Sequence, residues 1–132
     1  MKKNKILNFL KRTTGQSIVE FALVLPVLLL ILMGIVEFGR LLETTNVLTS
    51  AAREGVRVAA VSAPDVSQVN NAAQNILTAN NISNSTITVN GPNTNREVSV
   101  TVQITYVPLT GSFIPGLGSL QLTRSSRMHW EG

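Results

Sequence analysis

A long apolar stretch lies near the start of the chain, after a basic segment. Residues 18–36 read IVEFALVLPVLLLILMGIV, with Glu20 as the one charged position and sixteen uncharged positions in a row from Phe21 to Val36. A helix needs about 20 mostly apolar residues to cross a hydrocarbon core of about 30 Å. This stretch is apolar on all sides, as a helix surrounded by lipid must be, and a 132-residue chain leaves too little other mass to enclose it as a core helix. The pattern therefore predicts a membrane-spanning helix.

The helical pattern continues beyond this stretch. Between residues 37 and 61 there is no proline, and apolar or small residues recur every three or four positions, which places them on one face of a helix. Pro64 ends the run, because the residue before a proline avoids the helical conformation. We therefore expect one helix over residues 17–62, roughly 69 Å long at 1.5 Å per residue, whose second half stands outside the membrane.

After Pro64 the pattern changes to a short helix and then to strands. Asp65 can cap a helix that reaches about residue 79. Strand patterns follow over residues 86–90, 97–107 and 120–130. Strict alternation with one polar face predicts a small antiparallel sheet covered on one side by the helices. The fold class is thus α+β, with a basic leader at 1–15, a transmembrane helix with its extension at 16–62, and a small extracytoplasmic domain at 63–132.

Composition excludes several function classes. Hydrophobic residues make up 44% of the chain and charged residues 14%, against about 25% charged in a typical soluble protein. The chain has no Cys and a single His, His129, which excludes disulfides, thiolate zinc sites and cysteine nucleophiles and leaves a His-based triad or metal site without partners. We expect neither an enzyme nor a bound cofactor or metal.

The net charge of +4 belongs to the N-terminal tail. All four Lys lie in the first eleven residues, and removing residues 1–15 takes away five positive and no negative charges, which leaves −1. The remainder has no basic stripe for a phosphate backbone, so we do not expect nucleic-acid binding. By the positive-inside rule the cations place the N-terminus in the cytoplasm and the C-terminal part outside. A secretory signal peptide shares this layout, but no small-residue cleavage pattern follows the apolar run, so we expect the segment to be retained.

The junction between the leader and the apolar helix carries the candidate chemistry. Gly15 ends the leader, and Glu20 follows five residues later. Gly15 has no side chain, so an extended backbone there fits closely into a protease cleft. A carboxylate placed centrally in a membrane costs about 2.5–3.5 kcal/mol on insertion scales, so Glu20 requires a neutralising group. Cleavage after Gly15 would create one, the α-amino group of Gln16. The alternatives are an ordinary helix-start glycine and a glutamate that reaches the headgroups.

Three blocks of sequence resemble the TadE-like proteins, which are minor pilins of the tight adherence (Flp) pilus system. The blocks are GQSIVEFALVLP from Gly15, GIVEFGR from Gly34 and AAREGVR from Ala51. The resemblance covers about residues 12–60 and implies the properties of type IV pilins and pseudopilins. A prepilin peptidase would cut between Gly15 and Gln16, and Glu20, as the fifth mature residue, would pair with the Gln16 amine of a neighbouring subunit. Other pilins and the inner-membrane assembly platform are the implied further partners.

Two function classes remain open from the sequence. The first is a processed assembly protein of the cytoplasmic membrane, incorporated in a pilus or priming its assembly. The second is a single-pass anchored module whose β-rich domain binds an extracellular ligand without being processed or polymerised. Five charged residues of the helix extension are interpreted as a solvated or subunit-contacting face rather than a site: Glu37, Arg40, Arg53, Glu54 and Arg57.

Overall fold

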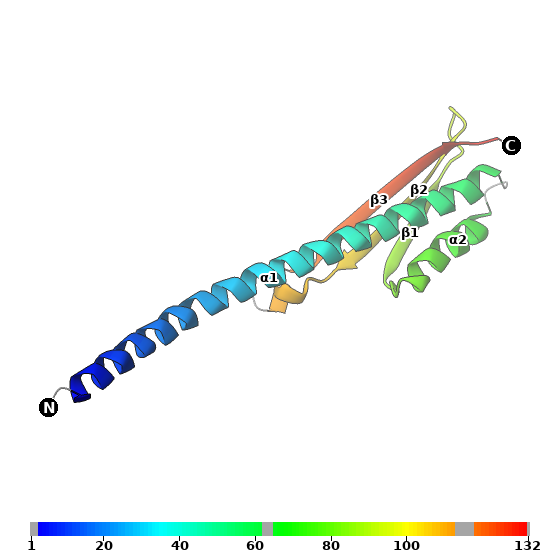
Figure 1. Ribbon diagram of the computed structural model, residues 1–132. Helices are drawn as coiled ribbons and strands as arrows, with labels where there is room; N and C mark the ends of the chain where they lie inside the picture. Colours follow the sequence, from blue (N-terminus) through cyan, green and yellow to red (C-terminus); the bar gives the residue numbers. More distant parts are fainter. Residues whose placement is uncertain (1–2, 62–64, 113–117, 132) are drawn as a thin grey trace. The chain divides into compact units, whose positions relative to one another are not determined.

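The computed structural model describes residues 3–61, 65–112 and 118–131. The elements in chain order are α1 (Lys3–Val61), α2 (Val66–Ala79), β1 (Ser85–Asn90), β2 (Glu97–Tyr106), a 3₁₀ helix (Leu109–Ser112) and β3 (Leu120–His129) (Figure 1). The predicted α+β class, with one long helix, one short helix and three strands, is confirmed. The chain divides into two compact units, Met1–Val36 and Glu37–Gly132, and α1 contributes to both.

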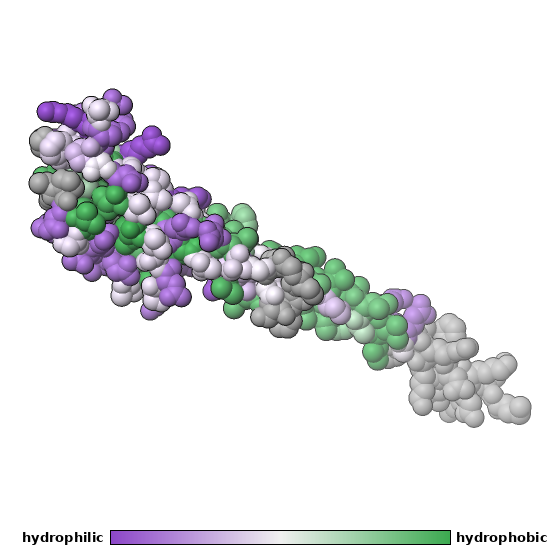
Figure 2. All heavy atoms as spheres, turned by 180° about the vertical axis from the view of Figure 1, so that it is seen from behind, coloured by the Kyte–Doolittle hydropathy of each residue, from purple (hydrophilic) through white to green (hydrophobic). Residues whose placement is uncertain are grey.

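The first unit consists of the N-terminal part of α1. Among the side chains described from Gly15 to Val36, all but that of Met33 are exposed, and the helix contains a window that is long and apolar enough to cross a membrane. Figure 2 shows these hydrophobic residues along the helix surface. The prediction that the helix starts at residue 17 is wrong, because α1 already begins at Lys3. The leader has no proline to break a helix and contains several Lys and Leu, which favour one.

The second unit buries one face of a three-stranded antiparallel sheet of order β1-β2-β3 under α2 and the second part of α1 (Figure 1). The central strand β2 supplies every second residue to the core, as its alternation predicts. The buried core residues are Leu48, Ala51, Ala52, Val56 and Ala59 from α1, Val69, Ala73 and Leu77 from α2, and Val98, Val100, Val102 and Ile104 from β2. The second part of α1 is therefore an integral part of this domain.

Two glycines make close approaches possible in this unit. A Cβ at Gly55 of α1 would lie 3.1 Å from Cγ1 of Val100 and 3.4 Å from Cβ of Ala73, so glycine lets α1 meet β2 and α2 at one point. Gly91, in the turn after β1, has a φ of +111°, and a Cβ there would lie 2.5 Å from the carbonyl oxygen of Glu97. A side chain at Gly91 would collide with the backbone of β2.

A local cap fixes the start of α2, and a contact from the C-terminal segment meets the end of α1. Asp65 caps α2 as predicted, and its carboxylate accepts hydrogen bonds from the backbone N–H and hydroxyl of Ser67, which lower the pKa of Asp65. α1 ends at Val61, one residue before the predicted end, and Pro64 lies outside the described residues. The C-terminal segment returns to this helix end, where the N–H of Glu131 donates to the carbonyl of Ala60 at 3.2 Å.

The other face of the sheet carries polar side chains. Two cross-strand pairs hold them in place: Thr101 donates to Ser125 at 3.1 Å, and Gln103 donates to Gln121 at 2.6 Å. Hydroxyl and amide pairs of this kind stabilise adjacent strands. The sheet therefore has one face covered by helices and one polar face, as predicted.

Candidate functional site

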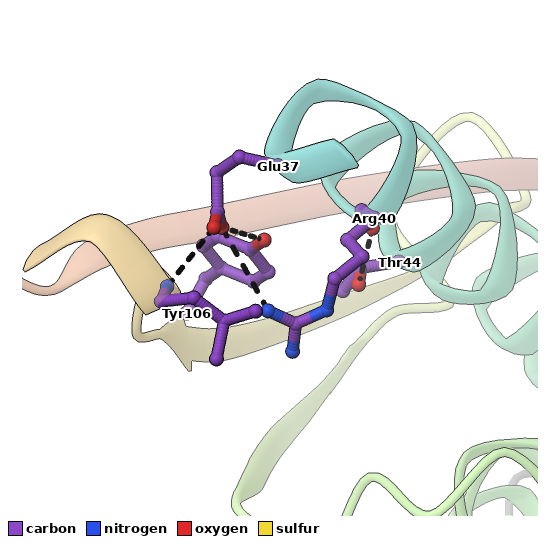
Figure 3. A network of polar contacts seen from close by, with 5 residues as sticks. Glu37, Arg40, Thr44 and Tyr106 are labelled. Atoms are coloured by element: carbon purple, nitrogen blue, oxygen red, sulfur yellow. Dashed lines mark hydrogen bonds and ion pairs between the residues drawn. The ribbon is translucent and has the colours of Figure 1, made fainter. Parts of the chain in front are cut away.

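A carboxylate at the first helical residue after the apolar stretch joins α1 to the sheet. Glu37 accepts a hydrogen bond from the hydroxyl of Tyr106, the last residue of β2, through Oε1. Its second oxygen, Oε2, accepts one from the backbone N–H of Leu109 at 3.0 Å. Leu109 begins the 3₁₀ helix, where an N–H lacks a partner within the helix. One side chain thus holds together three elements (Figure 3).

Arg40 adds a positive charge to this site from one turn further along α1. Its Nη1 lies 3.9 Å from Oε1 of Glu37, and its guanidinium lies 6.0 Å from the centroid of the Tyr106 ring, within the range of a cation–π contact. The side chain of Glu37 is 15% exposed and that of Arg40 is 43% exposed. The glutamate is thus enclosed by its partners, whereas the arginine retains access to solvent.

The electrostatics of the site favour a neutral tyrosine beside a charged glutamate. Burial raises the pKa of Tyr106, and the hydrogen bond to Glu37 and the negative charge of that carboxylate raise it further, against a lowering by Arg40. The phenol therefore keeps its proton and remains a hydrogen-bond donor to the carboxylate. A buried tyrosine hydroxyl generally finds such a partner, and here the partner comes from a different element of the fold.

Glu37 was interpreted above as part of a solvated or subunit-contacting helix face, and the solvated alternative is wrong, because the side chain is 15% exposed and is hydrogen-bonded within the chain. Contact of this face with a subunit stays a prediction. The hydrogen bond to Tyr106 joins residues 69 positions apart, which no local pattern records. The one sequence signal is that Tyr106 falls on the apolar face of its strand, where its hydroxyl needs a partner. The interpretation holds for Glu54 and Arg57, which form an ion pair of 2.6 Å with each other on the outer side of α1.

The residues predicted for processing and subunit pairing lie away from Glu37 along the sequence, near the start of the apolar stretch. Gly15, Gln16 and Glu20 are all exposed, and a Cβ at Gly15 would meet nothing within 4 Å. The side-chain amide of Gln16 donates to Oε1 of Glu20 at 3.1 Å within the same helix. Gly15 is helical here rather than extended, and the cleavage and the pairing between subunits stay predictions.

Within residues 3–61, 65–112 and 118–131 there is no group of three or more His, Cys, Asp or Glu that would hold a metal ion. An open groove of about 410 Å³ lies beside Arg40 and Tyr106, and its far wall is formed by the residues that connect α2 to β1. The groove is lined largely by amide and hydroxyl side chains, with the charged side chains of Arg40 and Glu43 among them.

Comparison with known proteins identifies the N-terminal part of the chain. The model of a family described as TadE-like protein matches residues 15–57, about a third of the chain. No match was found among the curated proteins or among the solved structures. The matched segment begins at Gly15 and includes Glu20, Glu37 and Gly55. The resemblance predicted from the sequence is therefore confirmed, and residues 15–57 form a TadE-like segment.

Proposed function

We propose that this protein is a minor pilin or pseudopilin that takes part in the assembly of a tight adherence (Flp) type IV pilus. The observation that carries the proposal is the TadE-like match, which begins at Gly15, the residue after which a prepilin peptidase would cut. The match then runs through the whole apolar stretch and into the part of α1 that packs on the sheet. A TadE-like segment of this extent supports a role in a Tad pilus system.

The first step in this function is retention in the cytoplasmic membrane. The apolar window of α1 is not buried within the protein, and lipid is the environment in which such a surface is stable. The basic leader stays on the cytoplasmic side, where the peptidase removes it, and the unit from Glu37 onward lies outside. Before assembly the protein is thus a single-pass membrane protein.

The second step is packing of the apolar helices against those of other pilins. Cleavage gives Gln16 a positively charged α-amino group, which pairs with Glu20 of a neighbouring copy. A misplaced subunit leaves both charges unpaired in an apolar environment, which is costly. The pair therefore acts as a register device that sets the stagger between subunits. In the uncleaved chain Glu20 is instead bound by the side-chain amide of Gln16.

The site at Glu37 contributes to this function by holding the second unit together. It fixes the end of β2 and the start of the 3₁₀ helix to the first residue after the apolar stretch. These contacts lie within the second unit and keep its sheet attached to its own part of α1. The inner-membrane assembly platform would then receive this unit as one folded domain.

The mature N-terminus tests the proposal. Protein extracted from membranes of cells that carry the peptidase should begin at Gln16 by mass spectrometry. A Gly15→Leu variant should retain the leader, whereas Gly34→Leu, at a second glycine with open space around it, should be cleaved normally. A native protein that still begins at Met1 would contradict processing and favour the anchored binding module instead.

A further inference from the structure

Exposed apolar side chains gather at one end of the second unit. Eight large apolar residues of this unit are exposed among those described, and four of them form what we call the apolar patch: Phe38, Val107, Leu109 and Leu120, with exposed fractions of 62%, 67%, 52% and 47%. They come from α1, from the residues that follow β2, and from the first position of β3. Exposed apolar residues are ordinary when scattered singly, but a group of them marks an interaction surface.

The hydrogen bonds of Glu37 fix where this patch lies. Leu109 donates its N–H to Glu37, and Tyr106 donates its hydroxyl to the same carboxylate. Leu120 is the cross-strand partner of Tyr106 in the sheet, and Val107 is the next residue in the chain. Leu109 is thus itself a partner of Glu37, and the other three members of the patch are adjacent in sequence or sheet register to Glu37 or to Tyr106.

Glu37 itself follows directly after Val36, the last residue of the apolar stretch. When residues 17–36 span the bilayer, Glu37 must lie at the level where the chain leaves the hydrocarbon. The hydrogen bonds then hold Leu109 and Tyr106 at the same level, whatever the orientation of the sheet relative to the membrane. The patch is therefore placed at the lipid–water boundary by contacts within the second unit and by the covalent bond between residues 36 and 37.

The polar groups near the patch suit this boundary. The carboxylate of Glu37 is satisfied by two donors. Tyr106 combines an apolar ring with a polar hydroxyl, a property that places tyrosine at membrane interfaces. Arg40, 43% exposed, holds its guanidinium beside Glu37 and Tyr106, and a basic side chain of this length at a membrane boundary can also reach lipid headgroups. The opposite end of the sheet instead carries Asn90, Asn93, Glu97 and Arg127 around a polar hollow.

We propose that the apolar patch lies in the interfacial layer of the outer side of the membrane and that its partner is the surface of the lipid bilayer. The proposal rests on the membrane span of the proposed function. In the membrane state the domain is then held by two attachments, the apolar helix and the patch, and incorporation into a filament requires the patch to leave the lipid. A neighbouring protein subunit on the same patch is the competing occupant.

Nitroxide labels at single cysteines test this directly, because the natural chain contains no Cys. The full-length protein would be reconstituted into vesicles of phosphatidylcholine and phosphatidylglycerol. Collisions of each label with oxygen, which concentrates in lipid, would be compared with collisions with a water-soluble nickel complex. Labels at Val107→Cys and Leu109→Cys report on the patch, Leu29→Cys on the span, and Asn93→Cys on the polar end of the sheet.

The expected result is an oxygen-to-nickel collision ratio at positions 107 and 109 that is shifted from that of Asn93→Cys toward that of Leu29→Cys. Water-like ratios at both patch positions, with a lipid-like ratio at Leu29→Cys, would overturn the proposal that the patch contacts lipid and would leave the membrane span supported. Low collision rates with both reagents at the patch, which rise when the protein is diluted with lipid, would show that a neighbouring protein covers the patch. This result would also overturn the proposal of lipid contact. A water-like ratio at Leu29→Cys would overturn both the proposed membrane span and the proposed lipid contact of the patch.

Discussion

Tyr106 donates its hydroxyl hydrogen to the carboxylate of Glu37, and this bond joins the last residue of β2 to the first residue of α1 beyond the apolar stretch. The same carboxylate accepts the N–H of Leu109. A carboxylate that accepts two hydrogen bonds leaves two donors without partners when it is removed, and unsatisfied donors in a partly buried site are costly. The attachment of this end of the sheet, at Tyr106, to α1 therefore depends on Glu37.

The first prediction is that Glu37→Ala destabilises the second unit more than Glu54→Ala. Glu54 pairs with Arg57 on the outer side of the same helix, and loss of such an exposed pair changes the free energy of unfolding by about 0.5 kcal/mol or less. Trp130, the single tryptophan, packs against the core, so its fluorescence in detergent micelles reports unfolding. Glu37→Gln keeps an acceptor oxygen, so its free energy of unfolding should lie between those of the two alanine variants. Equal stability of the two alanine variants would contradict the role of Glu37.

The second prediction concerns the titration of Tyr106, the one tyrosine of the chain. Its pKa is raised above the ordinary value of 10.0 by burial first, and then by the hydrogen bond to Glu37 and the charge of that residue. A group whose pKa is raised on folding stabilises the folded state below its ordinary pKa, and this contribution is lost as the pH rises through the raised value. We therefore expect alkaline pH to weaken the attachment of β2 to α1.

The absorbance of the phenolate during an alkaline titration measures this pKa in the folded protein. Glu37→Gln should bring the pKa of Tyr106 part of the way back, since the negative charge is removed while burial remains. Glu54→Gln is the matched control and should leave the titration curve unchanged. A tyrosine that titrates at its ordinary pKa in the wild-type protein would contradict the buried hydrogen bond.

Much of the fold follows from local patterns in the sequence. The predicted strands agree with the structure within one residue at all six ends, because alternation of period two is maintained along β2. Asp65 marks the start of α2 by a local hydrogen bond. The start of α1 was not predicted, since the basic leader contains no breaker that separates it from the helix. A processing site is read by an enzyme and leaves no requirement on the backbone of the uncleaved chain.

The site at Glu37 was beyond prediction for a different reason. A glutamate with an arginine three positions later forms a favourable pair on any exposed helix, so the local pattern for Glu37 is the same as that for Glu54 and Arg57. What separates them is the contact with Tyr106 and Leu109, which depends on the path of the chain through α2 and β1. Only the buried position of a tyrosine hydroxyl indicates that such a partner must exist.

The third prediction uses two glycines of α1 in different surroundings. A Cβ at Gly55 would lie 3.1 Å from Val100, whereas one at Gly39 would meet nothing within 4 Å. Gly55→Val should therefore overpack the core and lower the free energy of unfolding by about 1–3 kcal/mol. Gly39→Ala should raise it by about 0.5–1 kcal/mol, because alanine is the better helix former. Denaturation followed by Trp130 fluorescence compares them, and equal effects would contradict the close packing of α1 on β2.

The fourth prediction concerns the core that α1 supplies. Leu48 is fully buried, whereas Leu42, six residues earlier on the same helix, is 49% exposed. Leu48→Ala should cost about 2–5 kcal/mol, because it removes apolar contacts and leaves a cavity. Leu42→Ala should have a much smaller effect on the same fluorescence-detected transition. A small effect of Leu48→Ala would show that the sheet and α2 form a core without α1.

The last prediction separates the α-amino group of Gln16 from its side chain. In the uncleaved chain the amide of Gln16 binds Glu20 within one helix, whereas the proposed contact in the filament uses the amine released by cleavage. Glu20→Ala should therefore leave membrane insertion and cleavage intact but abolish piliation, and Gln16→Ala, which keeps the amine, should still allow pili to form. Electron microscopy of the two strains gives the answer. Normal pili with Glu20→Ala would remove the carboxylate from the mechanism, and loss of pili with a correctly cleaved Gln16→Ala would assign the pairing to the side chain.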